Sequence, residues 1–136
     1  MAGKVVSDSS GGGQYFKPDD GMYLLEFVEI EETTRPVWQS DEQEPAWRWK
    51  ALMYDFASKQ PVIDPETKQQ AVYQDRTKQS LHIRSNGYKR VAAFLKRDPA
   101  VGETEEELFA AMPGKRCFGT FSGGWLKAVV RTPEGF

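Results

Sequence analysis

Cysteine and histidine are almost absent from this chain, which has one of each among its 136 residues. The single Cys117 excludes an internal disulfide and any zinc motif built on paired cysteines, and the single His82 excludes the usual histidine-rich metal sites. We therefore expect no metal and no cofactor. Cys117 has no adjacent base, so it is interpreted as a small buried side chain rather than a nucleophile.

Long apolar runs and catalytic motifs are also missing. No stretch approaches the roughly 20 residues of a membrane span, and the first residues lack an apolar signal core. The glycines at 11–13 and 123–124 lack the context of a phosphate-binding loop. Carboxylates of the first expected strand, such as Glu29 and Glu31, are interpreted as a solvated face. We therefore expect a cytoplasmic protein with no catalytic residues and no membrane partner.

What the chain does have is a segregated positive charge. The 22 residues from Arg76 to Arg97 hold seven Lys or Arg and no Asp or Glu, whereas the formal net charge of the chain is −2. A local positive field attracts a polyanion even when the whole molecule is mildly acidic. The alternative is an ordinary solvated basic face.

Residue patterns predict one mainly β domain between two tails. We expect a flexible N-terminal tail at 1–14, a domain at 15–131 and a short C-terminal tail at 132–136. Within the domain, strand formers and alternation predict five strands, and caps and apolar stripes predict two helices. The strands are expected at 22–32, 46–56, 76–84, 115–121 and 125–131, and the helices at 86–97 and 105–112. Ser85 is the expected N-cap of the first helix, and Thr104 with Glu107 makes a capping box for the second.

Two of these strands have a basic face. In the second strand, Trp47 and Trp49 lie on a face interpreted as core, and Arg48, Lys50 and Tyr54 lie on the opposite face. The sequence leaves open which of the two faces meets a ligand. In the third expected strand, one face carries a run of polar and basic side chains: Arg76, Lys78, His82 and Arg84. Arg and Lys bind phosphates, and aromatic rings stack on bases.

The order of the elements matches an OB-type barrel, which has five strands and a helix between the third and fourth. In such a barrel the second and third strands form the ligand surface, so the two basic faces would be neighbours. The basic residues of the first helix, among them Lys89, would lie away from the groove. Trp38, in a loop, is either a stacking lid or a packed ring, and Trp125 is expected to be packed.

The layout resembles that of phage-encoded single-stranded-DNA-binding proteins of the OB type. The resemblance rests on three segments and covers about residues 15–131. The segments are Phe16-Lys17-Pro18-Asp19-Asp20-Gly21-Met22-Tyr23, Trp47-Arg48-Trp49-Lys50-Ala51 and Pro113-Gly114-Lys115-Arg116-Cys117. It implies binding of single-stranded DNA in phage replication or recombination, in the host cytoplasm.

The sequence therefore predicts a protein, not an enzyme, that binds single-stranded nucleic acid without strong sequence preference. The expected binding residues are Arg48, Lys50, Tyr54, Arg76, Lys78, His82, Arg84 and Trp38. The alternative is a protein-interaction or virion-associated β-barrel domain whose basic block docks an acidic partner. The sequence leaves open whether the ligand is DNA or RNA, whether the chain forms a homo-oligomer, and which replication or recombination proteins it meets.

Overall fold

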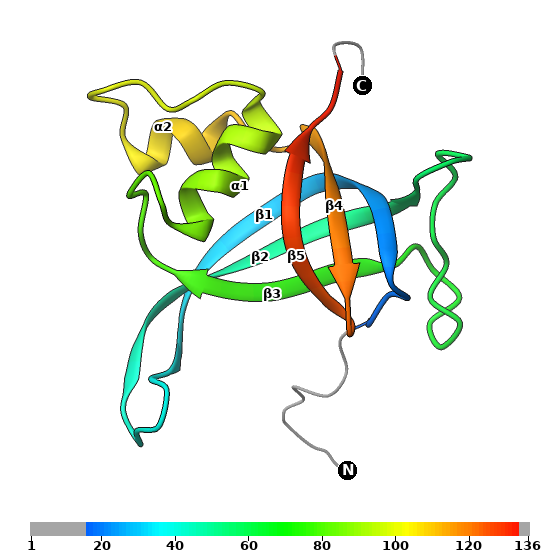
Figure 1. Cartoon of the computed structure of the whole chain (residues 1–136), viewed down its shortest axis with the longest axis horizontal. Coiled ribbons are helices and arrows are strands. Elements are labelled where there is room, and N and C mark those ends of the chain that lie inside the picture. The colour runs from blue at the N-terminus through cyan, green and yellow to red at the C-terminus, as the bar shows by residue number, and fades with distance from the viewer. Residues whose placement is uncertain (1–15, 134–136) are drawn as a thin grey trace.

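Five antiparallel strands and two short helices make up the computed structural model, which describes residues 16–133 (Figure 1). The elements are β1 (Gly21–Pro36), β2 (Gln43–Asp55), β3 (Val72–Lys78), α1 (Asn86–Leu95), α2 (Glu105–Ala110), β4 (Arg116–Ser122) and β5 (Trp125–Arg131). The strand order in the sheet is β3-β2-β1-β4-β5. Within the described residues no backbone ladder joins the edge strands β3 and β5, so the sheet is not closed. The predicted mainly β class and the order of its elements are confirmed.

The first two strands are longer than the sequence predicts, and their outer ends form a projecting arm. Residues 33–45 lie outside the predicted strands, yet Pro36 pairs with Gln43, and Pro45 pairs with Thr34. Pro45 is tolerated because β3 joins β2 only from Ala46 onward, which leaves this part of β2 without a second neighbour. Figure 1 shows the arm extending beyond the body of the sheet, away from the helices.

The third strand ends earlier than predicted, and the extension to Arg84 is wrong. β3 stops at Lys78, after which the Gln79 side chain donates to the Ala46 carbonyl at 3.0 Å. The chain then turns toward α1, with the Ser85 hydroxyl donating to the Ser80 carbonyl at 2.9 Å. Consequently His82 and Arg84 lie in the β3–α1 loop and not on a strand face.

Both helices begin at their predicted caps. The Tyr88 amide donates to the Ser85 hydroxyl at 3.1 Å, and the capping box of Thr104 and Glu107 is complete. However, α1 ends at Leu95 because Lys96 adopts a left-handed conformation with φ 60°. The helix is therefore shorter than the predicted 86–97, and α2 likewise ends at Ala110 rather than at residue 112.

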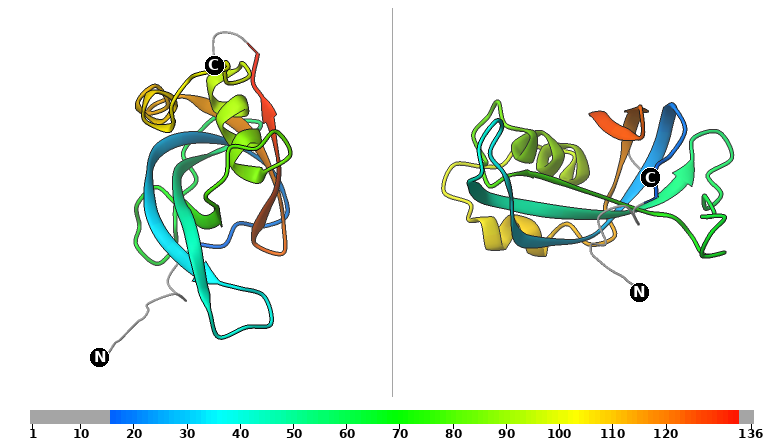
Figure 2. Two further views of the ribbon diagram at one scale, coloured as in Figure 1. Left: turned by 90° about the vertical axis from the view of Figure 1, so that its left-hand side faces the viewer. Right: turned by 90° about the horizontal axis from the view of Figure 1, so that it is seen from below.

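The tryptophan face of β2 forms the centre of the core. Trp47 and Trp49 are 2% and 4% exposed, so the basic face of β2 is the outward one. The Trp49 indole donates to the Thr77 hydroxyl on β3 at 2.7 Å, which satisfies its buried N–H. Phe109, which follows the capped start of α2, packs edge-to-face on Trp47 with ring centroids 5.0 Å apart. The helices thus cover one end of the sheet (Figure 2).

A buried ion pair fastens α1 to the edge strand β3. The Arg90 guanidinium donates to both Asp75 carboxylate oxygens at 2.5 and 2.6 Å, and both side chains are about nine-tenths buried. Tyr73 donates to the same carboxylate at 3.2 Å and accepts the Leu126 amide of β5 at 2.9 Å. This network links α1, β3 and β5 where the sheet is open, and burial together with Asp75 raises the pKa of Tyr73.

The expected tail at 1–14 lies outside the described residues. Of the expected tail at 132–136, the structure describes the first two residues, and Thr132 is buried. No helix in the described part of the chain is both long and apolar enough to span a bilayer.

Candidate nucleic-acid interface

An open groove lies between the projecting arm, the edge of β3 and the start of β5. Its volume is ≈ 840 Å³, and ten residues line it: Arg35, Pro36, Val37, Trp38, Gln39, Ser40, Glu44, Asp75, Arg76 and Trp125. In Figure 1 both the tip of the arm and the β4–β5 turn lie below β3. Two exposed tryptophans, one on the arm and one on β5, contribute to the lining.

Trp38 occupies the tip of the arm and is 84% exposed. A tight turn holds it there: the Val37 amide donates to the Glu42 carbonyl at 2.9 Å, and Gln39 takes a left-handed conformation with φ 57°. A ring of this size is normally buried or partnered, so its exposure indicates a surface available to a ligand. The stacking alternative for Trp38 therefore fits the structure better than the packing alternative.

Trp125 contributes the second ring and corrects the expectation that it is packed. Trp125 follows the turn at Gly123 and Gly124, which have φ 64° and 84°. It is the first residue of β5 and is 48% exposed. The Lys17 ammonium lies over its ring at 5.4 Å. A sequence signal was present, because the first residue after a two-glycine turn lies at the end of a hairpin rather than in its packed middle.

Arg76 is the cation of the groove that lacks a carboxylate partner. Arg35 pairs with Glu44 across the arm at 2.7 Å, and Asp75 is neutralised by Arg90. Arg76 donates to the Thr34 backbone carbonyl at 2.9 Å and forms no ion pair within residues 16–133. An anion entering the groove therefore meets a guanidinium whose charge is not compensated.

The predicted basic faces of β2 and β3 are indeed neighbours, but part of their charge is neutralised. Arg48 is the cross-strand partner of Arg76, which places both on the outward face. Lys50 lies 3.0 Å from Glu29 and 3.1 Å from Glu31, and the hydrogen bond that it donates to Glu29 raises the pKa of Lys50. Arg48 lies 3.9 Å from Glu31. The interpretation of these glutamates as a solvated face holds, since their side chains are 49% and 43% exposed, and they are also the ion-pair partners of β2.

Three other predicted residues lie outside the groove. Tyr54 is near the opposite end of β2, where its hydroxyl donates to Glu26 at 3.4 Å and the Arg116 guanidinium covers its ring at 4.9 Å. His82 and Arg84 are exposed in the loop before α1, where the Arg84 amide donates to His82 Nδ1 at 3.3 Å. The groove therefore gathers only Trp38 and Arg76 from the predicted set, and Lys78 follows on the outward edge of β3.

The rest of the basic block divides into paired and unpaired residues. Arg90 is paired with Asp75, Arg97 is paired with Glu103 at 2.7 Å, and Lys96 donates to the Pro133 carbonyl at 3.3 Å. Lys78, Arg84 and Lys89 form no ion pair with any described residue. The count of Lys and Arg in residues 76–97 therefore overstates the positive charge that this segment offers to a ligand.

Metal-ligating clusters and the single cysteine can be assessed in the part of the chain that the structure describes. No cluster of three or more metal-ligating side chains occurs there. Cys117 is fully buried, as predicted, and burial raises the pKa of its thiol to about 12, so it is not a thiolate at neutral pH. Comparisons with family models, with curated proteins and with solved structures found no match to this chain.

Proposed function

We propose that this chain binds single-stranded DNA, without strong sequence preference, in the groove between the arm, β3 and β5. The observation that carries the proposal is the presence of two exposed tryptophans beside an uncompensated arginine. Bases of any kind have a π-face on which an indole stacks, and a guanidinium binds the phosphate between them. This combination binds single strands of any sequence, because neither contact reads the identity of the base.

We propose further that the sheet is an incompletely closed OB-type barrel. The strand order leaves β3 and β5 as edges, and the Leu126 amide of β5 reaches the Tyr73 hydroxyl of β3 at 2.9 Å. In OB-type barrels, ligands lie across the second and third strands, between the loop that joins strands one and two and the loop that joins strands four and five. The groove occupies the corresponding position here, which supports the assignment.

Phosphate contacts would come first from Arg76 and Lys78, because neither forms an ion pair among the described residues. Arg48 and Lys50 would contribute less, since each would have to exchange a glutamate for a phosphate. The proposed biological setting is phage replication or recombination. It is supported by the resemblance in layout to phage single-stranded-DNA-binding proteins.

The proposal is tested by following tryptophan fluorescence during titration with oligo-dT and, separately, with heparin of equal charge. Stacking on Trp38 and Trp125 quenches fluorescence, whereas docking of a polyanion on basic side chains does not require contact with the rings. Quenching by oligo-dT alone supports the proposal. Equal responses to both polymers, or no response to oligo-dT at low salt, would instead favour the alternative of a domain that docks an acidic protein.

A further inference from the structure

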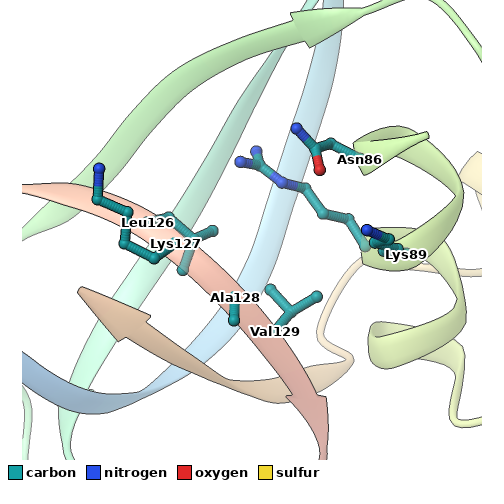
Figure 3. A pocket seen from close by; sticks show the side chains of 7 residues that line it. Asn86, Lys89, Leu126, Lys127, Ala128 and Val129 are labelled. Atoms are coloured by element: carbon teal, nitrogen blue, oxygen red, sulfur yellow. The ribbon is translucent and has the colours of Figure 1, made fainter. Parts of the chain in front are cut away.

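A second hollow, of ≈ 180 Å³, lies between the start of α1 and β5 (Figure 3). It is lined by Asn86, Lys89, Arg90, Leu126, Lys127, Ala128 and Val129. No carboxylate is among these residues. Lys89 from the helix and Lys127 from the strand are both exposed, and neither forms an ion pair in the described part of the chain. The hollow is therefore cationic on both of its walls.

The hollow is connected to the groove in two ways, through consecutive residues of β5 and through the Asp75–Arg90 ion pair. Trp125 lines the groove, and the next two residues of β5, Leu126 and Lys127, line the hollow. Asp75 lines the groove, and its ion-pair partner Arg90 lines the hollow. The two cavities are thus neighbours across the seam between the start of β5 and β3, where the Leu126 amide donates to the Tyr73 hydroxyl.

The seam itself presents no uncompensated negative charge. Both Asp75 oxygens accept hydrogen bonds from Arg90, and one also accepts the Tyr73 hydroxyl. A polyanion crossing from the groove to the hollow would therefore not meet a free carboxylate at the crossing. Beyond the crossing, the positive charges of Lys127 and Lys89 attract the polyanion.

The size of the hollow determines which part of a nucleotide, the base or the phosphate, can bind in it. A volume of ≈ 180 Å³ is below the ~300 Å³ at which pockets for drug-sized ligands begin. Its lining has no aromatic ring on which a base could stack. Lysines bind phosphate as point charges, without a demand for planar geometry. The hollow is therefore suited to a backbone phosphate and not to a base.

We propose that a single strand bound in the groove continues over the seam and places a backbone phosphate between Lys89 and Lys127. The proposal rests on the proposed function and names a further part of the same binding surface. It also reverses the expectation that the cations of the first helix lie away from the bound strand. Affinity should then depend on oligonucleotide length, because a short strand fills the groove without reaching the hollow.

The test measures fluorescence anisotropy of labelled oligo-dT over the range of about 4 to about 16 nucleotides that one OB-type domain covers. The protein is the full chain and its double variant Lys89→Gln/Lys127→Gln, at about 150 mM salt to screen long-range effects. The matched control is Lys68→Gln/Lys115→Gln, which removes the same charge from exposed lysines that line neither cavity.

We expect the double variant to bind the shortest oligonucleotide as the unchanged chain does and the longest about tenfold more weakly. Its salt slope for the longest strand should be shallower by about 0.7, because one phosphate contact is lost. A loss that is absent, equal at every length or matched by the control would overturn the proposal. Failure of the unchanged chain to bind any oligonucleotide would instead remove the proposed function itself.

Discussion

The four tryptophans of the chain fall into two classes that differ in exposure. Trp47 and Trp49 are almost fully buried, whereas Trp38 is 84% and Trp125 48% exposed. Burial of the first pair is a matter of folding, because Trp49 packs against Phe27 and bonds Thr77. Exposure of the second pair is what the proposed stacking on bases requires. Substitution should therefore separate the two classes.

Trp38→Ala is expected to weaken binding of oligo-dT by about 1–3 kcal/mol and to leave the free energy of unfolding unchanged, since the ring is 84% exposed and is proposed to stack on a base. Trp49→Ala should instead cost about 3–5 kcal/mol of folding stability as a core truncation. Anisotropy titrations and chemical denaturation measure the two quantities. Normal folding of Trp49→Ala together with loss of binding would mean that the buried face of β2 is the ligand surface.

The Asp75–Arg90 pair is the main polar contact between α1 and the sheet. Arg90→Met should lower the free energy of unfolding by about 3–5 kcal/mol, because it leaves the Asp75 carboxylate buried without its partner. Adding Asp75→Leu removes that stranded charge, so the double variant should recover part of the loss. Denaturation of both single variants and the double variant gives the coupling energy. Additive losses would show that the two side chains act independently.

Among the elements, the α1–α2 connection is held by an acid-sensitive contact. Arg97 donates to both oxygens of Glu103 at 2.7 and 2.9 Å, and this hydrogen bonding lowers the pKa of Glu103 from 4.5 to about 2. A depressed carboxyl pKa stabilises the folded state fully above the unfolded value of 4.5, and the stabilisation is lost as the pH falls toward about 2.

Thermal unfolding between pH 2 and 7 should therefore show a fall in Tm below about pH 4.5 that Glu103→Gln makes smaller. Glu66→Gln, in the exposed β2–β3 connection, is the matched control and should retain the full fall. If Glu103→Gln and the unchanged chain lose Tm in parallel over this window, the contact with Arg97 does not stabilise the connection.

Patterns of neighbouring residues were sufficient to predict the helix starts and the buried face of β2. The capping residues Ser85 and Thr104 and the alternation around Trp47 identified both helix starts and the buried face of β2. The end of β3 could not be predicted, because the alternation of side chains continues through Arg84 while the chain has already turned to follow α1. Periodicity reports which residues alternate, but not where the neighbouring strand stops.

The candidate site was predicted only in part, because its composition depends on contacts between distant segments. Trp38 and Arg76 could be selected as single residues of suitable chemistry. Neutralisation of Lys50 by Glu29 depends on the register between β1 and β2, which a bulge after Phe27 shifts. The pairing of Arg90 with Asp75 depends on how α1 docks. A count of charges along the chain contains neither piece of information.

For the whole molecule, the distribution of unpaired cations sets the salt dependence of binding. If Arg76 and Lys78 each contact a phosphate and one more phosphate lies between Lys89 and Lys127, three contacts form. The slope of log affinity against log salt should then be about −2.1, at about −0.7 per contact. Anisotropy at several salt concentrations measures it. A slope near zero would contradict a phosphate-binding surface.

The most direct test of the central claim follows the four indole N–H signals in a two-dimensional ¹⁵N–¹H spectrum during titration with oligo-dT. Assignment by single Trp→Phe substitutions separates the exposed rings from the buried ones. Binding in the groove predicts that the signals of Trp38 and Trp125 shift or broaden, because these rings line it. The signals of Trp47 and Trp49, which are buried on the inner face of β2, should stay in place. Saturable binding that moves neither Trp38 nor Trp125 would contradict the account.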